Sequence, residues 1–294
     1  MGASTYSSFT ILNINDEVLR KESLFLFNEA ENRAKYYLNF HFGNSRGGIR
    51  LIEFRDVSKR YEDGTLAVKE LSLTVEKGEI FVLIGPSGCG KTTTMKMVNR
   101  LIDHTDGKIL IDGKEIYQFN IFELRRNIGY VLQQIALFPH LTVEENISVV
   151  PELLKWKKER TKDRVTELMK IAGLDSKLRS KKPSELSGGQ QQRVGVLRAL
   201  AADPDVIIMD EPFSALDPIS RGQLQDDIKR LNDELGKTIL FVTHDMQEAM
   251  KLGDRIALMR DGELMLVGTP EEILASEDPF VLEFTQRGRG ELDA

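Results

Sequence analysis

The residues from Gly85 to Thr92 read GPSGCGKT, which fits the phosphate-binding pattern G-x-x-x-x-G-K-S/T. Glycines at these spacings let consecutive backbone N–H groups turn inward and hold phosphate oxygens, assisted by the positive end of the following helix. We expect Lys91 to reach the β- and γ-phosphates, the Thr92 hydroxyl to bind Mg²⁺ and Thr93 to bond a phosphate oxygen. The alternative is a glycine-rich turn without a ligand, but an apolar strand pattern precedes the loop and a helix pattern follows it. The sequence therefore predicts an ATP or GTP site made by Gly85, Pro86, Ser87, Gly88, Cys89, Gly90, Lys91, Thr92 and Thr93.

Cys89 is the single cysteine of the chain, so an internal disulfide is excluded and a reducing compartment is indicated. Its place among phosphate-binding amides at a helix N-terminus predicts a lowered thiol pKa. We therefore expect thiol reagents to inhibit the protein and ATP to protect it.

A second chemical feature is the apolar run from Val206 to Met209 followed by Asp210 and Glu211. A buried strand that ends in two acids places carboxylates at the ligand-binding edge of an open sheet. We expect Asp210 to hold Mg²⁺ and Glu211 to polarise the water that attacks the γ-phosphate. Taken alone, the two acids are equally typical of residues that cap the next helix. Together with the glycine-rich loop they indicate phosphoryl transfer.

Residues 186–190 read LSGGQ, and two glycines that open a helix form another anion-binding N-terminus. Because one glycine-rich loop holds the phosphates of only one nucleotide, this second site needs a different explanation. The run resembles the signature of the ATP-binding cassette (ABC) family. The resemblance implies that two subunits associate head to tail and that Ser187, Gly188, Gly189 and Gln190 of one close over the ATP of the other.

Four further positions resemble ABC motifs in family order. The resemblance implies that Tyr61 stacks on adenine and that Gln133 senses Mg²⁺ and the γ-phosphate. It also implies that Asp217, in the run 214–217, lies in the loop that crosses the dimer interface, and that His244 contacts the γ-phosphate. Taken singly, Tyr61 is also interpretable as a packing aromatic, Gln133 as a loop hydrogen-bonder and His244 as a polar residue at a helix start.

These residues must be positioned by alternating strands and helices, from about residue 51 to 285. Alternating or continuous apolar patterns predict strands over 51–57, 71–75, 79–84, 108–111, 128–132, 206–209 and 238–242. Helical patterns cover 91–101, 143–149, 160–172 and a long segment after Ser187. The fold class is therefore α/β, a P-loop NTPase with a mainly parallel sheet flanked by helices. The resemblance adds an antiparallel β subdomain and a helical subdomain, which we place at about residues 138–202 of a domain spanning 49–285, before a tail over 286–294.

Residues 1–48 differ from the rest, because they are rich in aromatics and show no sustained period of 2 or 3.6. A regulatory or docking extension and an unstructured tail are two interpretations. We favour a third, translated upstream sequence, because Arg46, Gly47 and Gly48 can be encoded by a purine-rich ribosome-binding sequence just before a UUG start at Leu51. Mass spectrometry of the first peptide of the native protein tests this hypothesis.

Composition excludes several classes of function. The 294 residues carry 40 Lys and Arg against 46 Asp and Glu, a net charge of −6, which argues against a nucleic-acid partner. With 41% hydrophobic residues the chain is globular, and it has no apolar run near the roughly 20 residues that cross a bilayer. Chromosome-structure ATPases carry a long coiled coil between the glycine-rich loop and the signature, and this sequence has no heptad run there. Ribosome-associated cassette proteins usually carry two cassettes in one chain, whereas this sequence has one glycine-rich loop and one signature.

The remaining class is the motor subunit of a membrane importer. Residues 136–143 resemble the segment that lies under the transporter's coupling helix. The stretches 60–64, 95–102, 128–146 and 190–198 resemble the ATPase subunit of osmoprotectant importers for glycine betaine, carnitine and choline. That resemblance implies ATP and Mg²⁺ as cofactors. It implies as partners a homodimer or a similar cassette, membrane-spanning permease subunits and, indirectly, an extracytoplasmic substrate-binding protein. It places the protein peripherally on the cytoplasmic face of the membrane.

Two alternatives stay open: an importer ATPase for another solute such as an amino acid or polyamine, and a free-standing cassette ATPase that regulates a soluble partner. Members of the osmoprotectant subfamily often carry a pair of regulatory CBS modules after the cassette. Because this sequence ends at Ala294, we expect a short form or regulation that resides elsewhere.

Overall fold

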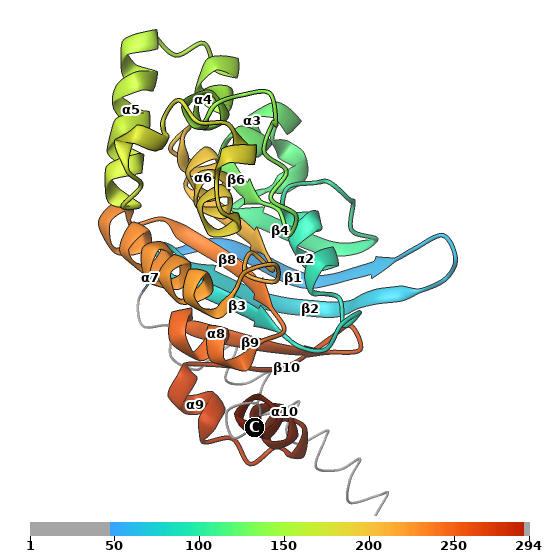
Figure 1. Cartoon of the computed structure of the whole chain (residues 1–294). Helices are drawn as coiled ribbons and strands as arrows, with labels where there is room; N and C mark the ends of the chain where they lie inside the picture. Colours follow the sequence, from blue (N-terminus) through green and yellow to red (C-terminus); the bar gives the residue numbers. More distant parts are fainter. Residues whose placement is uncertain (1–47, 291–294) are drawn as a thin grey trace, which may run out of the picture. The chain divides into compact units, whose positions relative to one another are not determined.

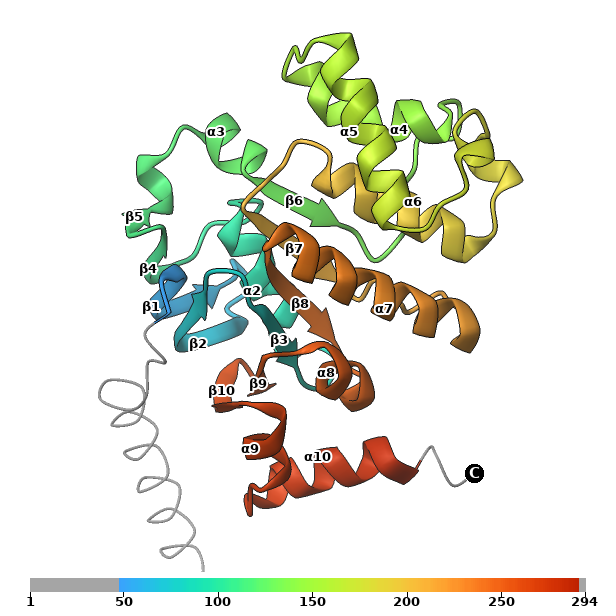
Figure 2. The ribbon, with the colours of Figure 1, turned by 90° about the vertical axis from the view of Figure 1, so that its left-hand side faces the viewer.

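The computed structural model describes residues 48–290, with the backbone alone for 286–290. The predicted extension therefore lies outside the described residues except for Gly48, and the predicted tail is described only in part. Between these limits the chain forms two sheets with helices around them (Figures 1 and 2).

The central sheet has six strands in the order β10-β9-β3-β8-β7-β6. The neighbours from β9 to β6 pair in parallel, and β10 pairs antiparallel with β9 at one edge. Strands β3, β7 and β8 are buried along their whole length, as expected for continuous apolar strands covered on both faces. The strands are β3 (Ile80–Ile84), β6 (Ile128–Val131), β7 (Val206–Asp210), β8 (Thr238–Thr243), β9 (Arg255–Arg260) and β10 (Glu263–Gly268).

One face of this sheet packs against helices, and the apolar cluster there contains alternate residues of β3 such as Val82 and Ile84. The other face packs through Phe81 and Leu83 onto α2 and a second sheet. The period of two along the strand thus divides the core into two layers. The helices are α2 (Lys91–Val98), α3 (Ile121–Arg126), α4 (Val143–Leu153), α5 (Lys158–Ile171), α6 (Gly188–Leu200), α7 (Pro218–Leu235), α8 (Met246–Leu252), α9 (Pro270–Leu274) and α10 (Pro279–Gly290).

The second sheet is antiparallel, with the strand order β2-β1-β4-β5. Its strands β1 and β2 alternate buried apolar residues such as Phe54 and Leu73 with polar residues that are exposed or half-buried, which is typical of a sheet with one covered face. The strands are β1 (Arg50–Arg60), β2 (Leu66–Glu76), β4 (Asp106–Ile111) and β5 (Lys114–Glu115), and a short 3₁₀ turn, η1 (Ile116–Gln118), follows them.

The segment between β6 and β7 is helical, in agreement with the sequence pattern. Helices α4 and α6 each begin with a capping box, in which Thr142 pairs with Glu145 and Ser187 with Gln190. The 3₁₀ turns η2 (Ser176–Leu178) and η3 (Pro183–Glu185) connect α5 to α6. In Figure 2 the helices α4, α5 and α6 lie together at one end of the described chain.

The structure extends and corrects the element bounds. Helix α2 ends at Val98 rather than near residue 101, and Arg100 adopts a positive φ of 52° beyond it. Strands β9 and β10 and helices α9 and α10 were not predicted. The Asp261-Gly262 dipeptide between two apolar runs is a hairpin signal that identifies β9 and β10. Within residues 48–290, no helix is both long and apolar enough to cross a bilayer.

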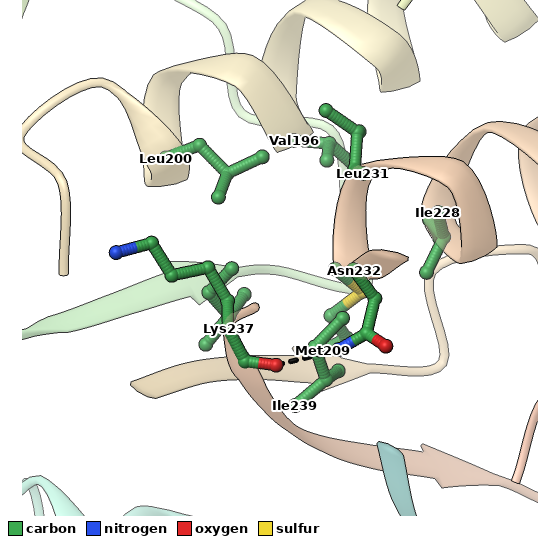
Figure 3. Close-up of a pocket in the computed structure, with 9 residues that line it drawn as sticks. Val196, Leu200, Met209, Ile228, Leu231, Asn232, Lys237 and Ile239 are labelled. Carbon is green, nitrogen blue, oxygen red and sulfur yellow. Dashed lines mark hydrogen bonds between the residues drawn. The ribbon is translucent and has the colours of Figure 1, made fainter. Parts of the chain in front are cut away.

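A small cavity lies between α6, α7 and the strands β7 and β8 (Figure 3). Its polar lining residue Asn232 donates a hydrogen bond to the Lys237 carbonyl oxygen at 2.5 Å. The polar group is therefore satisfied inside the protein, and the cavity is a packing gap rather than a substrate site. It is lined by Val196, Leu200, Ile207, Met209, Ile228, Leu231, Asn232, Lys237 and Ile239.

Candidate active site

The chemistry-bearing residues gather where four parallel strands end. The glycine-rich loop follows β3, Asp210 is the last residue of β7, and His244 follows β8. Gln133 comes two residues after β6 ends. Because the carboxyl ends of parallel strands meet at one edge, these side chains share the crevice where open α/β sheets bind ligands.

The loop from Gly85 to Gly90 is pressed against backbone on two sides. A Cβ at Gly85 would come 2.2 Å from the Met259 carbonyl oxygen, and one at Gly90 would come 2.4 Å from the Ala67 carbonyl oxygen. Gly90 also takes a left-handed φ of 105° at the N-cap of α2. Both positions therefore require glycine, and the loop is held in shape by β2 and β9.

Lys91 projects back into this loop. Its Nζ donates hydrogen bonds to the carbonyl oxygens of Gly85 at 2.7 Å and Pro86 at 2.9 Å, and the residue is 5% exposed. The ammonium thus lies inside the loop, where phosphate oxygens held by the loop amides would meet it.

Thr92 and Asp210 form the predicted metal pair. The Thr92 hydroxyl donates to Asp210 Oδ1 at 3.0 Å across 118 residues of chain. Burial raises the pKa of Asp210, and the Thr92 hydrogen bond acts in the opposite direction. Hydroxyl and carboxylate oxygens are ligands that Mg²⁺ accepts, so the donor set fits this ion. Among the described side chains, no group of three or more His, Cys, Asp or Glu residues is placed to hold a metal ion.

Glu211 joins Gln133 and His244. Its Oε2 accepts a hydrogen bond from Gln133 Nε2 at 3.2 Å and lies 3.4 Å from His244 Nδ1. Glu211 has a φ of 44°, in the left-handed region that few non-glycine residues adopt. The three predicted catalytic residues therefore meet at one oxygen of Glu211, which Gln133 and His244 both contact. The strained backbone of Glu211 is of the kind that is concentrated at functional sites.

Tyr61 lies beside the start of α2. Its hydroxyl oxygen is 3.3 Å from Thr93 Oγ1, and 39% of the residue is exposed. The aromatic side chain thus stands at the rim of the phosphate loop. This place is compatible with the predicted contact to adenine, which stays a prediction.

The signature residues lie elsewhere in the same chain. Ser187 and Gln190 bond to each other, and a Cβ at Gly189 would come 2.9 Å from the Ser220 side chain. Asp217 accepts hydrogen bonds from the N–H groups of Ile219 and Ser220 and so caps α7. Within residues 48–290 no hydrogen bond joins Ser187, Gly188, Gly189 or Gln190 to the loop at 85–93. The signature packs against the start of α7.

The prediction of a lowered thiol pKa at Cys89 is wrong. Cys89 is 4% exposed, and burial raises its pKa, although Lys91 Nζ at 3.8 Å opposes the shift. Desolvation disfavours the thiolate more than the nearby positive charge favours it. The thiol belongs to the apolar layer beneath the loop.

Two residues that hold the segment at 136–143 were not predicted from the sequence. Asn146 is fully buried, and its side chain bonds the backbone of Phe138, Leu141 and Thr142. Arg198, from α6, donates to the Ala136 carbonyl oxygen at 2.8 Å. A buried polar residue near a helix start is a weak sequence signal, since its partners appear only once the loop is folded.

Comparison with known proteins places this arrangement in a family. Residues 68–214 match the family model described as ABC transporter. The chain is 55% identical over 240 residues to OpuCA of Bacillus subtilis, a glycine betaine/carnitine/choline transport ATP-binding protein, covering 81% of this chain and 63% of that relative. It is 50% identical to YehX of Escherichia coli, a glycine betaine uptake system ATP-binding protein, covering 82% of this chain and 78% of the relative. The chain thus spans somewhat less than two thirds of the length of OpuCA.

A solved structure is similar as well. The dimeric ATP-binding cassette MJ0796, in a post-hydrolysis state with ADP and Pi, superposes with a TM-score of 0.66 and 35% identity, over 75% of this chain and 99% of that one. The mixed α/β fold with a mainly parallel sheet is thereby confirmed.

Proposed function

Because this chain belongs to the ABC transporter family, we propose that it is the ATP-hydrolysing subunit of an importer for quaternary amine osmoprotectants. The observation that carries the proposal is the convergence of Thr92 with Asp210, and of Gln133 and His244 with Glu211, at one sheet edge. The relatives named above are ATP-binding proteins of glycine betaine, carnitine and choline systems, which supports this class of solute.

Each side chain has a separate task in the proposed hydrolysis. Loop amides and Lys91 hold the β- and γ-phosphates. Thr92, Asp210 and Gln133 would hold Mg²⁺, which neutralises charge on the transferred phosphoryl group when bound. Glu211 orients the attacking water and accepts its proton.

Gln133 and His244 orient Glu211 itself. Both contact the same carboxylate oxygen, so they limit the rotation of that group toward the water. His244 then lies where it can contact the γ-phosphate, the role that the family resemblance gives it.

The active unit is proposed to be a head-to-tail homodimer or a pair with a similar cassette. The signature of this chain packs against α7 instead of bonding the glycine-rich loop of its own chain. It is therefore available to the nucleotide of a second subunit. The similar cassette MJ0796 is dimeric, which supports a dimer here.

The permease contact is proposed at residues 136–143. Asn146 and Arg198 clamp this segment from α4 and α6, while Phe138 within it and Leu132 shortly before it remain 42% and 44% exposed. A rigid loop with exposed apolar side chains suits a helix of a membrane-spanning permease subunit. The protein would then act peripherally on the cytoplasmic face of the membrane, and would serve an extracytoplasmic substrate-binding protein through the permease.

Hydrolysis by the purified protein tests the enzymatic part. We expect Mg²⁺-dependent phosphate release that rises more than linearly with protein concentration. Glu211→Gln should bind ATP, accumulate as a dimer and lose about 10²- to 10⁴-fold of turnover. Glu167→Gln, which alters an exposed acid of α5, is the matched control and should hydrolyse ATP at the wild-type rate.

Two results contradict the proposal. Unchanged turnover in Glu211→Gln refutes the role of this carboxylate. Affinity purification from membranes separates the partner classes: recovery of a multi-span membrane protein supports the importer, and recovery of a soluble protein alone supports the regulatory alternative.

A further inference from the structure

Arg221 connects two helices that begin beside the active site. Its backbone N–H bonds the Asp217 carbonyl oxygen at 2.9 Å in the first turn of α7. Its guanidinium reaches the start of α8, where Nη1 lies 3.6 Å from Asp245 Oδ2 and Nε lies 3.8 Å from Glu248 Oε1. One side chain therefore ties the beginning of α7 to the beginning of α8.

The start of α8 fixes the backbone on both sides of His244. The Thr243 hydroxyl donates to Glu248 Oε2 at 2.5 Å and accepts from the Asp245 N–H at 3.0 Å. Asp245 Oδ1 accepts from the N–H groups of Gln247 and Glu248 and caps the helix. Thr243 and Glu248 are buried, whereas the His244 side chain is 59% exposed and points to Glu211.

Arg221 places positive charge beside two acids. The carboxylates of Asp245 and Glu248 belong to one turn of helix, and burial raises the pKa of Glu248 to about 7 while Arg221 acts in the opposite direction. His244 also lies close enough to Glu248 to act on its pKa in the same direction as Arg221. Removing Arg221 would leave the two acids at the start of α8 without the guanidinium that faces both.

We propose that Arg221 is a positioning residue that couples the start of α7 to the orientation of His244. Arg221 follows Asp217 in the first turn of α7 and faces Asp245, which directly follows His244 in the chain, and His244 Nδ1 lies 3.4 Å from Glu211 Oε2. The inference rests on the proposed ATP hydrolysis and on the resemblance that places residues 214–217 at the dimer interface. Through this path, the position of α7 against a second subunit sets the position of the group that orients the catalytic carboxylate.

A competing interpretation is that Arg221 only holds α7 against α8. The chain offers a matched control, since Lys251 of α8 and Asp226 of α7 form a 2.7 Å ion pair between the same two helices. Lys251 lies in the last turn of α8, at the opposite end of the helix from His244. Lys251→Met therefore removes an ion pair between the helices and leaves the surroundings of His244 intact.

The experiment compares Arg221→Met with Lys251→Met in steady-state hydrolysis and in equilibrium binding of ADP and ATP. We expect Arg221→Met to lower kcat about ten- to a hundredfold, the usual effect of losing a group that orients a catalytic one. Its affinity for ADP should stay within about twofold of wild type, because only the γ-phosphate side of the site changes. Lys251→Met should match wild type in all three measurements.

Two further variants distinguish positioning from packing. Asp245→Asn keeps a good helix cap and removes the charge that Arg221 faces, so it should reproduce the loss of kcat even if Arg221→Met does not fold. In a His244→Ala background, Arg221→Met should lower kcat no further, because its effect passes through His244.

The inference is overturned if Arg221→Met keeps the wild-type kcat or if Lys251→Met lowers kcat by as much as Arg221→Met does. It is also overturned if Arg221→Met lowers kcat by the same factor in the His244→Ala background as in the wild type. A wild-type protein that hydrolyses no ATP would instead count against the proposed function. In that event the coupling is tested by the ratio of the ADP dissociation constant to the ATP dissociation constant. Arg221→Met should weaken ATP binding alone and so lower this ratio toward the value of His244→Ala. An unchanged ratio refutes the coupling.

Discussion

Asn146 clamps the segment proposed to meet the permease, and its replacement by leucine is the sharpest test of that clamp. The buried amide donates to the carbonyl oxygens of Phe138 at 3.1 Å, Leu141 at 3.1 Å and Thr142 at 2.9 Å, and accepts from the Phe138 N–H at 2.9 Å. Since an NH₂ group has two protons, about three full bonds are lost. Each bond contributes about 1 kcal/mol, and the buried backbone groups left unpaired add part of their desolvation cost. Asn146→Leu should therefore reduce the free energy of unfolding by about 3–5 kcal/mol.

Urea unfolding measures this loss. The single tryptophan of the chain, Trp156, follows α4 and donates its backbone N–H to the Pro151 carbonyl oxygen at 3.0 Å, so its fluorescence reports on this helical region. Far-ultraviolet circular dichroism reports on the whole fold. If the clamp stabilises the helical region by itself, the Trp156 transition of Asn146→Leu should come at lower urea than the dichroism transition.

Asn120→Leu is the matched control, because the exposed Asn120 side chain accepts one hydrogen bond, from the Phe122 N–H at 2.9 Å, as the cap of α3. It should lower stability by about 1 kcal/mol. A loss below about 1 kcal/mol in Asn146→Leu, or equal losses in the two variants, would refute the claim that Asn146 holds residues 138–142 in place.

Three other predictions follow from the contacts of the site and the core. In Gly189→Ala, the new Cβ would meet Ser220 at 2.9 Å and displace α6 from α7. ATP turnover should therefore fall about tenfold or more, because a displaced signature no longer meets the second subunit's nucleotide in the productive geometry. ATP binding to the monomer should stay unchanged, and equal turnover would contradict this. Burial raises the pKa of Glu79 to about 7 from 4.5, so the folded chain binds this proton more tightly. The free energy of unfolding should therefore fall as pH rises from about 4.5 to about 7. Glu79→Gln should flatten that fall in urea titrations at pH 5 and 8, and an identical slope in the variant would show that Glu79 is not its source. The Cys89 thiol should react with a disulfide reagent at pH 7.5 far more slowly in the native protein than in urea, because it is 4% exposed; equal rates would mean that it is accessible.

The strand ends of the site were predictable because their signals are local. The loop at 85–92 and the acids at 210 and 211 each combine an apolar strand with the polar residues that follow it. Parallel pairing then brings such ends together without knowledge of any particular contact. For this reason the meeting of Thr92 with Asp210, and of Gln133 with Glu211, agrees with the pattern.

Features that depend on tertiary neighbours were missed or mistaken. The prediction for Cys89 used the local helix terminus and omitted the burial beneath the loop, which dominates its pKa. Asn146 bonds backbone groups of the loop just before its own helix, whose folded shape no spacing along the sequence reveals, and the partners of Arg221 lie at the start of another helix. The hairpin of β9 and β10 was detectable from Asp261-Gly262, but its neighbour β3 is more than 170 residues distant in sequence.

The most direct test of the account is uptake of labelled glycine betaine, choline and carnitine after osmotic upshift. A strain without this gene is compared with the same strain carrying the wild-type gene or the Glu211→Gln variant at equal expression. The account predicts that the wild-type gene restores uptake of at least one of these amines and that Glu211→Gln does not. Uptake that is independent of the gene, or equally restored by Glu211→Gln, would contradict it.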